Sequence, residues 1–314
     1  MKPRWPVFIP SRGRAGFAPT MRELDRIGVP YRVIVEDFEH DAYARFYGEK
    51  RLLVIPPRYF AEYDSGDPDG DKAGLPFGPG LPRNLALDTA LAEGHAWHWT
   101  LDDNIRYWAR IDGNHCIRAG DGWVFAAMED HAARYANVGE AGPEYKMWVP
   151  CREAWPRPFR YNHRVMSCQL LRTAAAAPLR WRFRYNDDID FTIRLLEAGW
   201  CTINYIAFVQ AKQGTQHVPG GSSTTIYAGG TYAKTETLVR AHPRIVNRVL
   251  RWGRPHHMID WDRWEGQHPE RDPGWVPRPE VQAGYPTRLV TRRALREPGG
   301  PAPARRMRGT GGRG

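Results

Sequence analysis

Two adjacent carboxylates and an amide follow an apolar segment of this chain, at positions 102–104. Residues 96–101 place alternating apolar side chains on one face, which predicts a strand, and Asp102-Asp103-Asn104 comes directly after it. In an open α/β sheet the ligand crevice lies at the carboxyl ends of the strands. Oxygen ligands there suit a hard divalent cation that also binds a diphosphate. A solvated turn explains an Asp-Asp pair equally well, so both interpretations stay open.

A second acidic stretch, Asn186-Asp187-Asp188-Ile189-Asp190, opens an amphipathic pattern that predicts a helix over 189–197. Carboxylates in the first turn of a helix are stabilised by its dipole, and Asn186 or Asp187 could cap it. A cap explains one of these acids but not three. A carboxylate at such a turn can instead face a cleft and accept a proton from an attacking hydroxyl. The stretch alone fits both roles.

The histidine and cysteine residues give weaker evidence for a functional site. His217 lies in the glycine-rich segment 213–221 after an expected strand, which favours an accessible side chain, but an isolated histidine is usually neither ligand nor catalyst. The cysteines form no CxxC pair, so we expect reduced thiols rather than a thiolate zinc site. They are Cys116, Cys151, Cys168 and Cys201.

Strand and helix patterns alternate in the N-terminal half, as in βα units. Later helices and strands are less regular, and a long Gly-, Pro- and Asp-rich loop covers 63–82. The pattern predicts a three-layer α/β fold with its site at the carboxyl ends of the strands. The expected strands are 7–9, 31–35, 51–55, 96–101, 146–149, 165–171 and 202–209, and the expected helices are 19–27, 83–93, 122–135, 189–197 and 231–241.

Composition places the chain among folded cytoplasmic proteins. Its 314 residues are 42% hydrophobic and 25% charged, and neither a membrane-length apolar stretch nor a signal peptide is visible. The net charge is +10, and residues 287–314 contain eight arginines and one glutamate, so +7 of it lies in this tail. A basic tail suits a polyanion, and a solvated disordered end explains it as well.

The order of these motifs resembles the phage TET-associated glycosyltransferases, a GT-A family. The opening Pro10–Arg14 is similar to that family's IPSRGR, and Asp102–Asn104 resembles the metal-binding DxD. The resemblance extends over about residues 7–230. It implies a GT-A-like three-layer fold with a central mixed, mostly parallel sheet, which we assign to 1–250. Beyond it we expect a packed extension over 251–296 and, from its composition, a disordered basic tail over 297–314. Further matching segments are Val35-Glu36-Asp37 with Tyr43, Leu81-Pro82-Arg83-Asn84, the EDIDF-like Asn186–Phe191, and Gly199-Trp200.

The resemblance also implies residue roles. Asp188 would be the general base, with Asp187 beside it where the family has Glu, and Asn104 stands where the DxD motif has its second Asp. The residues implied to bind the donor are Pro10, Ser11, Arg12, Arg14, Glu36, Arg83, Asn84, Asp102 and Asp103. Those implied to hold the metal are Asp102, Asn104 and His217, and the residues expected to bind the acceptor are Arg160, Tyr161, Arg164 and Asp190.

The implied reaction is an inverting displacement on a UDP-sugar, such as UDP-glucose or UDP-N-acetylglucosamine, with Mn²⁺ or Mg²⁺. The implied acceptor is DNA carrying 5-hydroxymethylcytosine or a related pyrimidine, and we expect a monomer without a membrane partner. A saccharide or protein acceptor, a glycoside hydrolase and a non-catalytic nucleic-acid-binding protein are the alternatives. The expected DNA-facing strip comprises Arg152, Arg157, Arg160 and Arg164 with Trp155, Phe159 and Tyr161.

Overall fold

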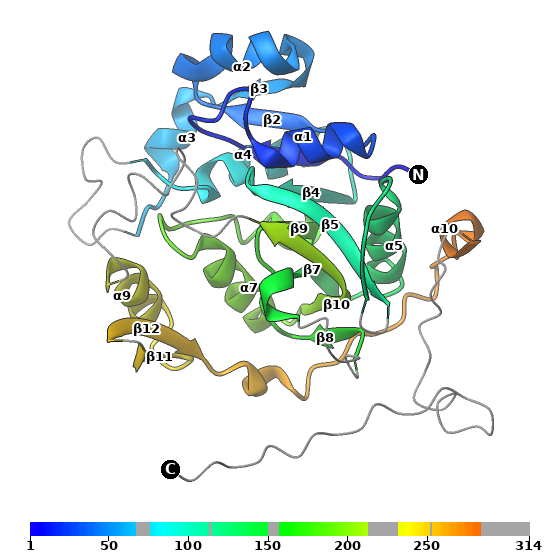
Figure 1. Ribbon diagram of the computed structural model, residues 1–314. Coiled ribbons are helices and arrows are strands. Elements are labelled where there is room, and N and C mark those ends of the chain that lie inside the picture. The colour runs from blue at the N-terminus through cyan, green and yellow to red at the C-terminus, as the bar shows by residue number, and fades with distance from the viewer. Residues whose placement is uncertain (67–75, 113–114, 150–156, 213–231, 252, 284–314) are drawn as a thin grey trace.

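The chain folds around one large β-sheet that carries helices on both faces (Figure 1). The computed structural model describes residues 1–66, 76–112, 115–149, 157–212, 232–251 and 253–283. Within these residues the sheet has ten strands. They are β1 (Val7–Pro10), β2 (Arg32–Val35), β3 (Leu52–Val54), β4 (Trp97–Leu101), β5 (Ile105–Asp112), β6 (His115–Arg118), β7 (Val138–Tyr145), β8 (Phe159–Tyr161), β9 (Cys168–Arg172) and β10 (Cys201–Lys212).

The sheet is mixed and mostly parallel. Its strand order is β3-β2-β1-β4-β9-β7-β10-β5-β6, and β8 pairs with β10. The first four strands in this order are mutually parallel. Strands β7, β10 and β6 run in the same direction, whereas β9, β5 and β8 run in the opposite one. This confirms the expected fold class.

Alternation along the strands divides the core between the two faces. In β1, Val7 and Ile9 pack in one buried cluster and Phe8 in another, because successive side chains point to opposite sides of a strand. One face is covered by α1 (Pro19–Arg26), α2 (His40–Tyr47) and α5 (Trp123–Ala132). The other is covered by α3 (Pro57–Glu62), α4 (Gly80–Ala92), α6 (Thr173–Ala176) and α7 (Asp187–Glu197).

A smaller unit packs beside α7. It comprises α9 (Tyr232–Ala241) and a hairpin of β11 (Val246–Arg251) and β12 (Arg254–Ile259), both at the lower left of Figure 1. Leu238, Val246 and Trp264 share a buried cluster with Ile189 and Ile193 of α7. The hairpin is therefore held against the helix that carries the second acidic stretch. The last described helix, α10 (Pro279–Ala283), contacts α5.

Most expected elements are present with boundaries shifted by a few residues. The expected strand over 146–149 is wrong, because β7 ends at Tyr145 and a 3-10 helix, η3 (Lys146–Trp148), follows. The sequence patterns also missed β5, β6 and the β11–β12 hairpin. Three more 3-10 helices are η1 (Asp37–Glu39), η2 (Glu49–Arg51) and η4 (Trp261–Trp264). No helix of the described residues is long and apolar enough to cross a bilayer.

Candidate active site

A cleft of about 810 Å³ opens where the sheet, α4, α7, α9 and the β11–β12 hairpin meet. Both acidic stretches reach it, although they are more than eighty residues apart in the chain. Eight of the nine residues predicted to bind the donor line this cleft, and Asn84 does not. The eight are Pro10, Ser11, Arg12, Arg14, Glu36, Arg83, Asp102 and Asp103.

A buried arginine joins the two acidic stretches. Arg83 Nη2 donates to Asp102 Oδ1 at 2.8 Å, and Nη1 donates to Asp187 Oδ2 at 2.5 Å. The Arg83 side chain is only 2% exposed, so these ion pairs form with little water around them. Pairing of this kind compensates the desolvation of all three groups. The arginine therefore sets the distance between the strand end and the start of α7.

The first carboxylate of the motif stays ionised in this setting. Burial on its own raises the pKa of Asp102, but the Lys212 ammonium and the Arg83 guanidinium together outweigh burial and lower it. Lys212 Nζ lies 3.6 Å from Asp102 Oδ2 and donates to Ser167 Oγ at 2.6 Å. Asp102 is thus a charged carboxylate held between two cations.

Its partner Asp187 is in a different electrostatic position. Burial raises the pKa of Asp187, and the nearby Asp188 and Asp102 carboxylates raise it further while Arg83 opposes them. Crowded carboxylates favour sharing of a proton, because two close negative charges disfavour each other. Asp187 is therefore easier to protonate than an exposed aspartate.

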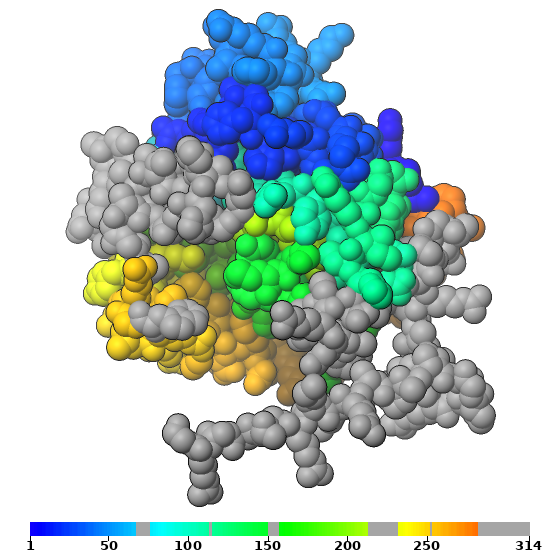
Figure 2. Space-filling model, viewed as in Figure 1, coloured from blue at the N-terminus to red at the C-terminus, as the bar shows by residue number. Residues whose placement is uncertain are grey.

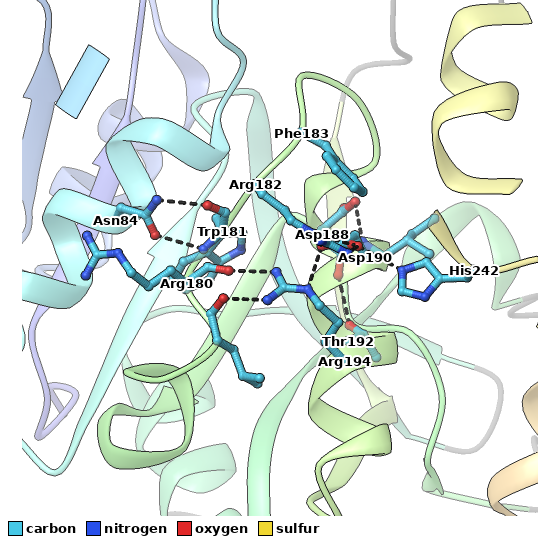
Figure 3. A network of polar contacts seen from close by, with 12 residues as sticks. Asn84, Arg180, Trp181, Arg182, Phe183, Asp188, Asp190, Thr192, Arg194 and His242 are labelled. Carbon is cyan, nitrogen blue, oxygen red and sulfur yellow. Dashed lines mark hydrogen bonds and ion pairs between the residues drawn. The ribbon is translucent and has the colours of Figure 1, made fainter. Parts of the chain in front are cut away.

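Close packing at the start of α4 lets Arg83 reach both acids. A Cβ at Gly80 would lie 2.2 Å from the Tyr63 hydroxyl oxygen and 3.2 Å from Asp187 Cβ, so only glycine fits there. Asn84 then fixes the neighbouring loop, because its side chain accepts from Trp181 N at 2.8 Å and donates to Trp181 O at 2.9 Å (Figure 3). Asn84 therefore clamps the chain before α7 and does not line the cleft, unlike the other residues expected at the donor.

The second acidic stretch is not a helix cap. Asn186 precedes α7 in the left-handed region, at φ 53°, and makes no side-chain capping bond. Its amide instead donates to Lys234 O at 2.9 Å. Asp188 lines the cleft, and its Oδ1 accepts a hydrogen bond from the backbone of Ile189 at 2.9 Å, but within the described residues it forms no ion pair. A non-glycine residue held at positive φ indicates local strain, which is common beside functional groups.

Asp190 lies two residues further along α7 and points into the interior. Its carboxylate is 0% exposed and binds Arg182, Arg194 and His242 (Figure 3). His242 Nε2 is 2.8 Å from Asp190 Oδ1. The prediction that Asp190 binds the acceptor is therefore wrong, because a fully buried, triply paired carboxylate has no access to a ligand.

The other expected acceptor residues divide in the same way. Arg164 lines the cleft and lies over the ring of Trp148. Arg160 is outside the cleft lining and pairs with Glu144, and Tyr161 packs on the core with its hydroxyl 3.4 Å from that of Tyr135. Arg152 and Trp155 lie outside the described residues. The strip expected to face DNA is thus not assembled at the cleft by the residues that can be placed.

The Asp103 carboxylate holds the loop after β1 in place through hydrogen bonds. Ser11 Oγ donates to Asp103 Oδ2 at 2.7 Å and receives the hydroxyl proton of Tyr43 at 2.7 Å. Arg14 Nη1 bonds the other oxygen of Asp103. Both oxygens of Asp103 therefore contact side chains of this loop, and the carboxylate holds the loop beside the cleft.

The outer part of this loop presents another charge pair. Arg12 Nε lies 2.9 Å from Glu36 Oε1, and Glu39 accepts from the backbone of Gly13 at 2.6 Å. These contacts hold the backbone between β1 and α1 beside the cleft.

Comparison with known protein families shows which family this chain belongs to. The family model of the TET-associated glycosyltransferases matches residues 5–221, which is more than half of the chain. The chain belongs to this family. It is therefore a glycosyltransferase.

Other comparisons add little. No curated protein matches the chain in sequence. Among solved structures, that of CMP:2-keto-3-deoxy-manno-octonic acid synthetase complexed with CTP is similar, with a TM-score of 0.36 and 10% sequence identity. The match covers 76% of this chain and 98% of that chain. So distant a likeness carries no argument about activity.

The donor atoms of this glycosyltransferase allow a divalent cation beside Asp102. Asn104 lines the cleft, and its Oδ1 is buried without a hydrogen-bond partner among the described residues. A buried amide oxygen without a hydrogen-bond partner costs free energy unless a cation or a water molecule contacts it. No group of three His, Cys, Asp or Glu side chains that could hold a metal occurs in the described residues, and His217 lies outside them. Asp102 and Asn104 fit the ion if diphosphate oxygens supply further ligands.

Sequence reasoning missed two lysines that face the cleft. Lys212 is the last residue of β10, and Lys234 is in the first turn of α9. Burial lowers the pKa of Lys234, while the Asp188 carboxylate opposes that shift. The rule that drew attention to Asp102, a polar group at a strand's carboxyl end, also applies to Lys212. Lys234 had no such signal, because only packing of α9 brings it to the site.

Proposed function

We propose that this glycosyltransferase moves a sugar from a UDP-sugar to the hydroxyl of 5-hydroxymethylcytosine, or a related hydroxymethylpyrimidine, in DNA. The observation that supports the chemistry is the position of Asp188. It lies in the same cleft as Asp102, and among the described residues it has no ion-pair partner. A carboxylate without a salt bridge remains available to accept a proton. The DNA acceptor is proposed from the family's name and the chain's basic character.

In the proposed mechanism Asp188 accepts the proton of the acceptor hydroxyl as that oxygen attacks the anomeric carbon. The bond from this carbon to the diphosphate breaks on the opposite face, so the configuration inverts. Proton removal by a positioned base typically contributes ~10²–10⁴-fold. Arg83 keeps Asp187 and Asp102 on either side of the reacting centre, and Lys212 and Lys234 add positive charge where the diphosphate leaves.

We further propose that Asp102 and Asn104 would hold Mn²⁺ or Mg²⁺ at the donor diphosphate. When bound, the ion supplies Lewis-acid stabilisation of the leaving group. UDP-glucose and UDP-N-acetylglucosamine are the first donors to test. Ser11, Arg12 and Arg14 of the loop after β1 line the cleft, and the guanidinium of Arg12 is the group we expect to approach the nucleotide phosphates.

One experiment tests donor, acceptor and metal together. The protein is incubated with hydroxymethylated or unmodified duplex DNA, each of several nucleotide sugars, and either Mn²⁺ or a chelator, and the nucleosides are then analysed by mass spectrometry. We expect a glycosylated hydroxymethyl nucleoside only with modified DNA, one donor class and metal. Transfer to a saccharide or protein instead, with none to DNA, would refute the acceptor. Full transfer in chelator would refute the metal.

A further inference from the structure

The β11–β12 hairpin carries a concentration of positive charge at the rim of the cleft. Residues 244–259 contain four arginines and two histidines but no aspartate or glutamate. The hairpin lies beyond residues 5–221, the part that the family model matches. Its charge is therefore a feature of this chain that the family assignment does not explain.

Two of these arginines are placed where they repel each other. Arg251 and Arg254 are cross-strand partners next to the turn, and both are exposed. Like charges directly opposite each other destabilise a strand pair. Arg248, further down the same strand, pairs with Glu236, whereas within the described part of the chain no carboxylate pairs with Arg251 or Arg254. Repulsion between these two arginines therefore destabilises the tip of the hairpin, and binding of an anionic partner would relieve it.

Exposed apolar side chains lie near the tip, and the hairpin is packed against α9 and α7. Leu250 is 74% exposed and Met258 is 45% exposed, so apolar side chains lie beside the charged ones. Thr235 of α9 donates to Pro255 O at 3.3 Å, and Val246 is buried against α7. The space-filling view shows the yellow and orange segment that contains the hairpin at the lower left of the surface (Figure 2). Binding there would need no rearrangement of the hairpin's base.

The hairpin is also close to the proposed chemistry. Arg251, His256 and Met258 line the same cleft as Asp188. Pro10 and Glu36, at the ends of β1 and β2, line the same cleft, and Figure 1 shows these strands in the upper part of the molecule, away from the hairpin at the lower left. A polymer bound along the hairpin would therefore approach Asp188 from the side away from the proposed nucleotide site.

We propose that the β11–β12 hairpin binds the phosphodiester backbone of the acceptor DNA and so positions the modified nucleotide at Asp188. This inference rests on the proposed function. Arginine contacts to backbone phosphates supply sequence-independent affinity and fix the register of a protein on a duplex. That suits an enzyme whose target is a modified base, which must turn out of the stack to reach a cleft. The donor diphosphate is the other source of phosphate that the tip could contact.

The test compares a double substitution with a matched control. Arg251→Gln/Arg254→Gln removes two charges at the tip, and Arg45→Gln/Lys50→Gln removes two exposed charges on and just after α2, outside the cleft lining. For wild type and both variants, affinity for hydroxymethylated duplex DNA is measured over a series of salt concentrations, and affinity for UDP is measured in parallel. Melting temperatures check that the folded state is unchanged.

We expect the tip variant to bind DNA more weakly, with the slope of log affinity against log salt reduced by about 1.8, or about 0.9 per lost phosphate contact. UDP affinity should stay at the wild-type value, and the control should match wild type in both measurements. Unchanged DNA affinity in the tip variant would overturn the inference, and loss of UDP affinity alone would assign the tip to the donor. If wild type itself binds no DNA, the proposed acceptor fails together with the hairpin's role.

Discussion

The two sides of the cleft differ in how their charges are matched. On the side formed by β1, β4 and α4, the carboxylates of Glu36, Asp102 and Asp103 each have an arginine partner. On the side formed by α7 and the hairpin, Asp188, Arg251 and Arg254 have no ion-pair partner among the described residues. Paired groups hold a fixed geometry, whereas unpaired ones are free to meet a ligand. In the proposed mechanism the first side holds the donor, and the second side acts on the acceptor.

The same difference occurs within one turn of α7. Asp187 is paired with Arg83, and Asp188 faces the cleft. Asp190 is buried among three basic side chains (Figure 3). Side chains one or two residues apart on a helix point in different directions, so adjacent acids need not share a role. Substitutions at these positions should therefore separate catalysis from stability.

The largest expected effect is on the rate of transfer in Asp188→Asn. Asparagine keeps the size of the side chain but cannot accept the hydroxyl proton as a base, so we expect transfer to fall ~10²–10⁴-fold. Affinity for UDP should change little, because Asp188 faces the acceptor in this proposal. Steady-state transfer rates and UDP titration measure the two quantities.

Asp190→Asn serves as the comparison for that variant. It leaves Arg182, Arg194 and His242 without their buried carboxylate, so it should lower the free energy of unfolding instead of acting on the chemistry alone. If Asp188→Asn keeps full transfer activity, the base is another group and the assignment fails.

The next effect is on stability, in Arg83→Met. Removal of the guanidinium leaves Asp187 and Asp102 as buried acids with one cation fewer, and breaking such pairs typically costs about 3–5 kcal/mol. Denaturant unfolding measures the change. Adding Asp187→Asn to this variant should recover part of the loss, since one uncompensated charge disappears. An Arg83→Met protein as stable as wild type would show that the pair does not hold the two sides together.

A third prediction concerns Glu140, a fully buried residue of β7 that forms a hydrogen bond with Thr192 of α7. Thr192 Oγ1 lies 3.0 Å from the Asp188 carbonyl and 2.7 Å from Glu140 Oε2. The hydroxyl has one proton, and the carbonyl can only accept it, so Glu140 must donate to Thr192 if both bonds exist. Gln169 donates to the other Glu140 oxygen at 2.6 Å. Burial raises the pKa of Glu140 to about 8, which agrees with a protonated acid at neutral pH.

The sign of the pH effect follows from this raised pKa. Between about pH 4.3, where an unfolded glutamate ionises, and the folded pKa of about 8, the folded state holds a proton that the unfolded state has lost. Stability from this group therefore falls as pH rises through that window, by at most about 1.4 kcal/mol per unit, and levels off above it. Glu140→Gln should unfold with a flatter pH dependence than wild type. Identical pH profiles of the two proteins would contradict a neutral Glu140.

The smallest expected effect is on metal requirement, in Asn104→Asp. A carboxylate in place of the amide adds a charged ligand beside Asp102, so we expect the Mn²⁺ concentration for half-maximal transfer to fall, by at most about tenfold. The measurement is a metal titration of transfer at fixed donor and acceptor. An unchanged titration would place the ion, if it binds, away from Asn104.

Several features of this protein could be predicted from local sequence. The apolar alternation before Asp102 and the amphipathic pattern after Asp188 predicted β4 and α7, because both depend on residues close in the chain. The order of short motifs predicted the family that the model comparison shows. The hairpin escaped notice because Gly253 and Pro255 interrupt any clear period in the sequence.

Tertiary structure alone decided which polar side chain does what. The sequence supplied three aspartates in one stretch, an Arg-Asn pair and scattered basic residues, and on local grounds each could have been assigned to a ligand. Long-range packing buried Asp190, turned Asn84 onto the backbone of Trp181, and brought Lys234 and Arg251 to the cleft. The physical reason is that a side chain's charge state and partners depend on what surrounds it after folding, and those neighbours come from distant parts of the chain.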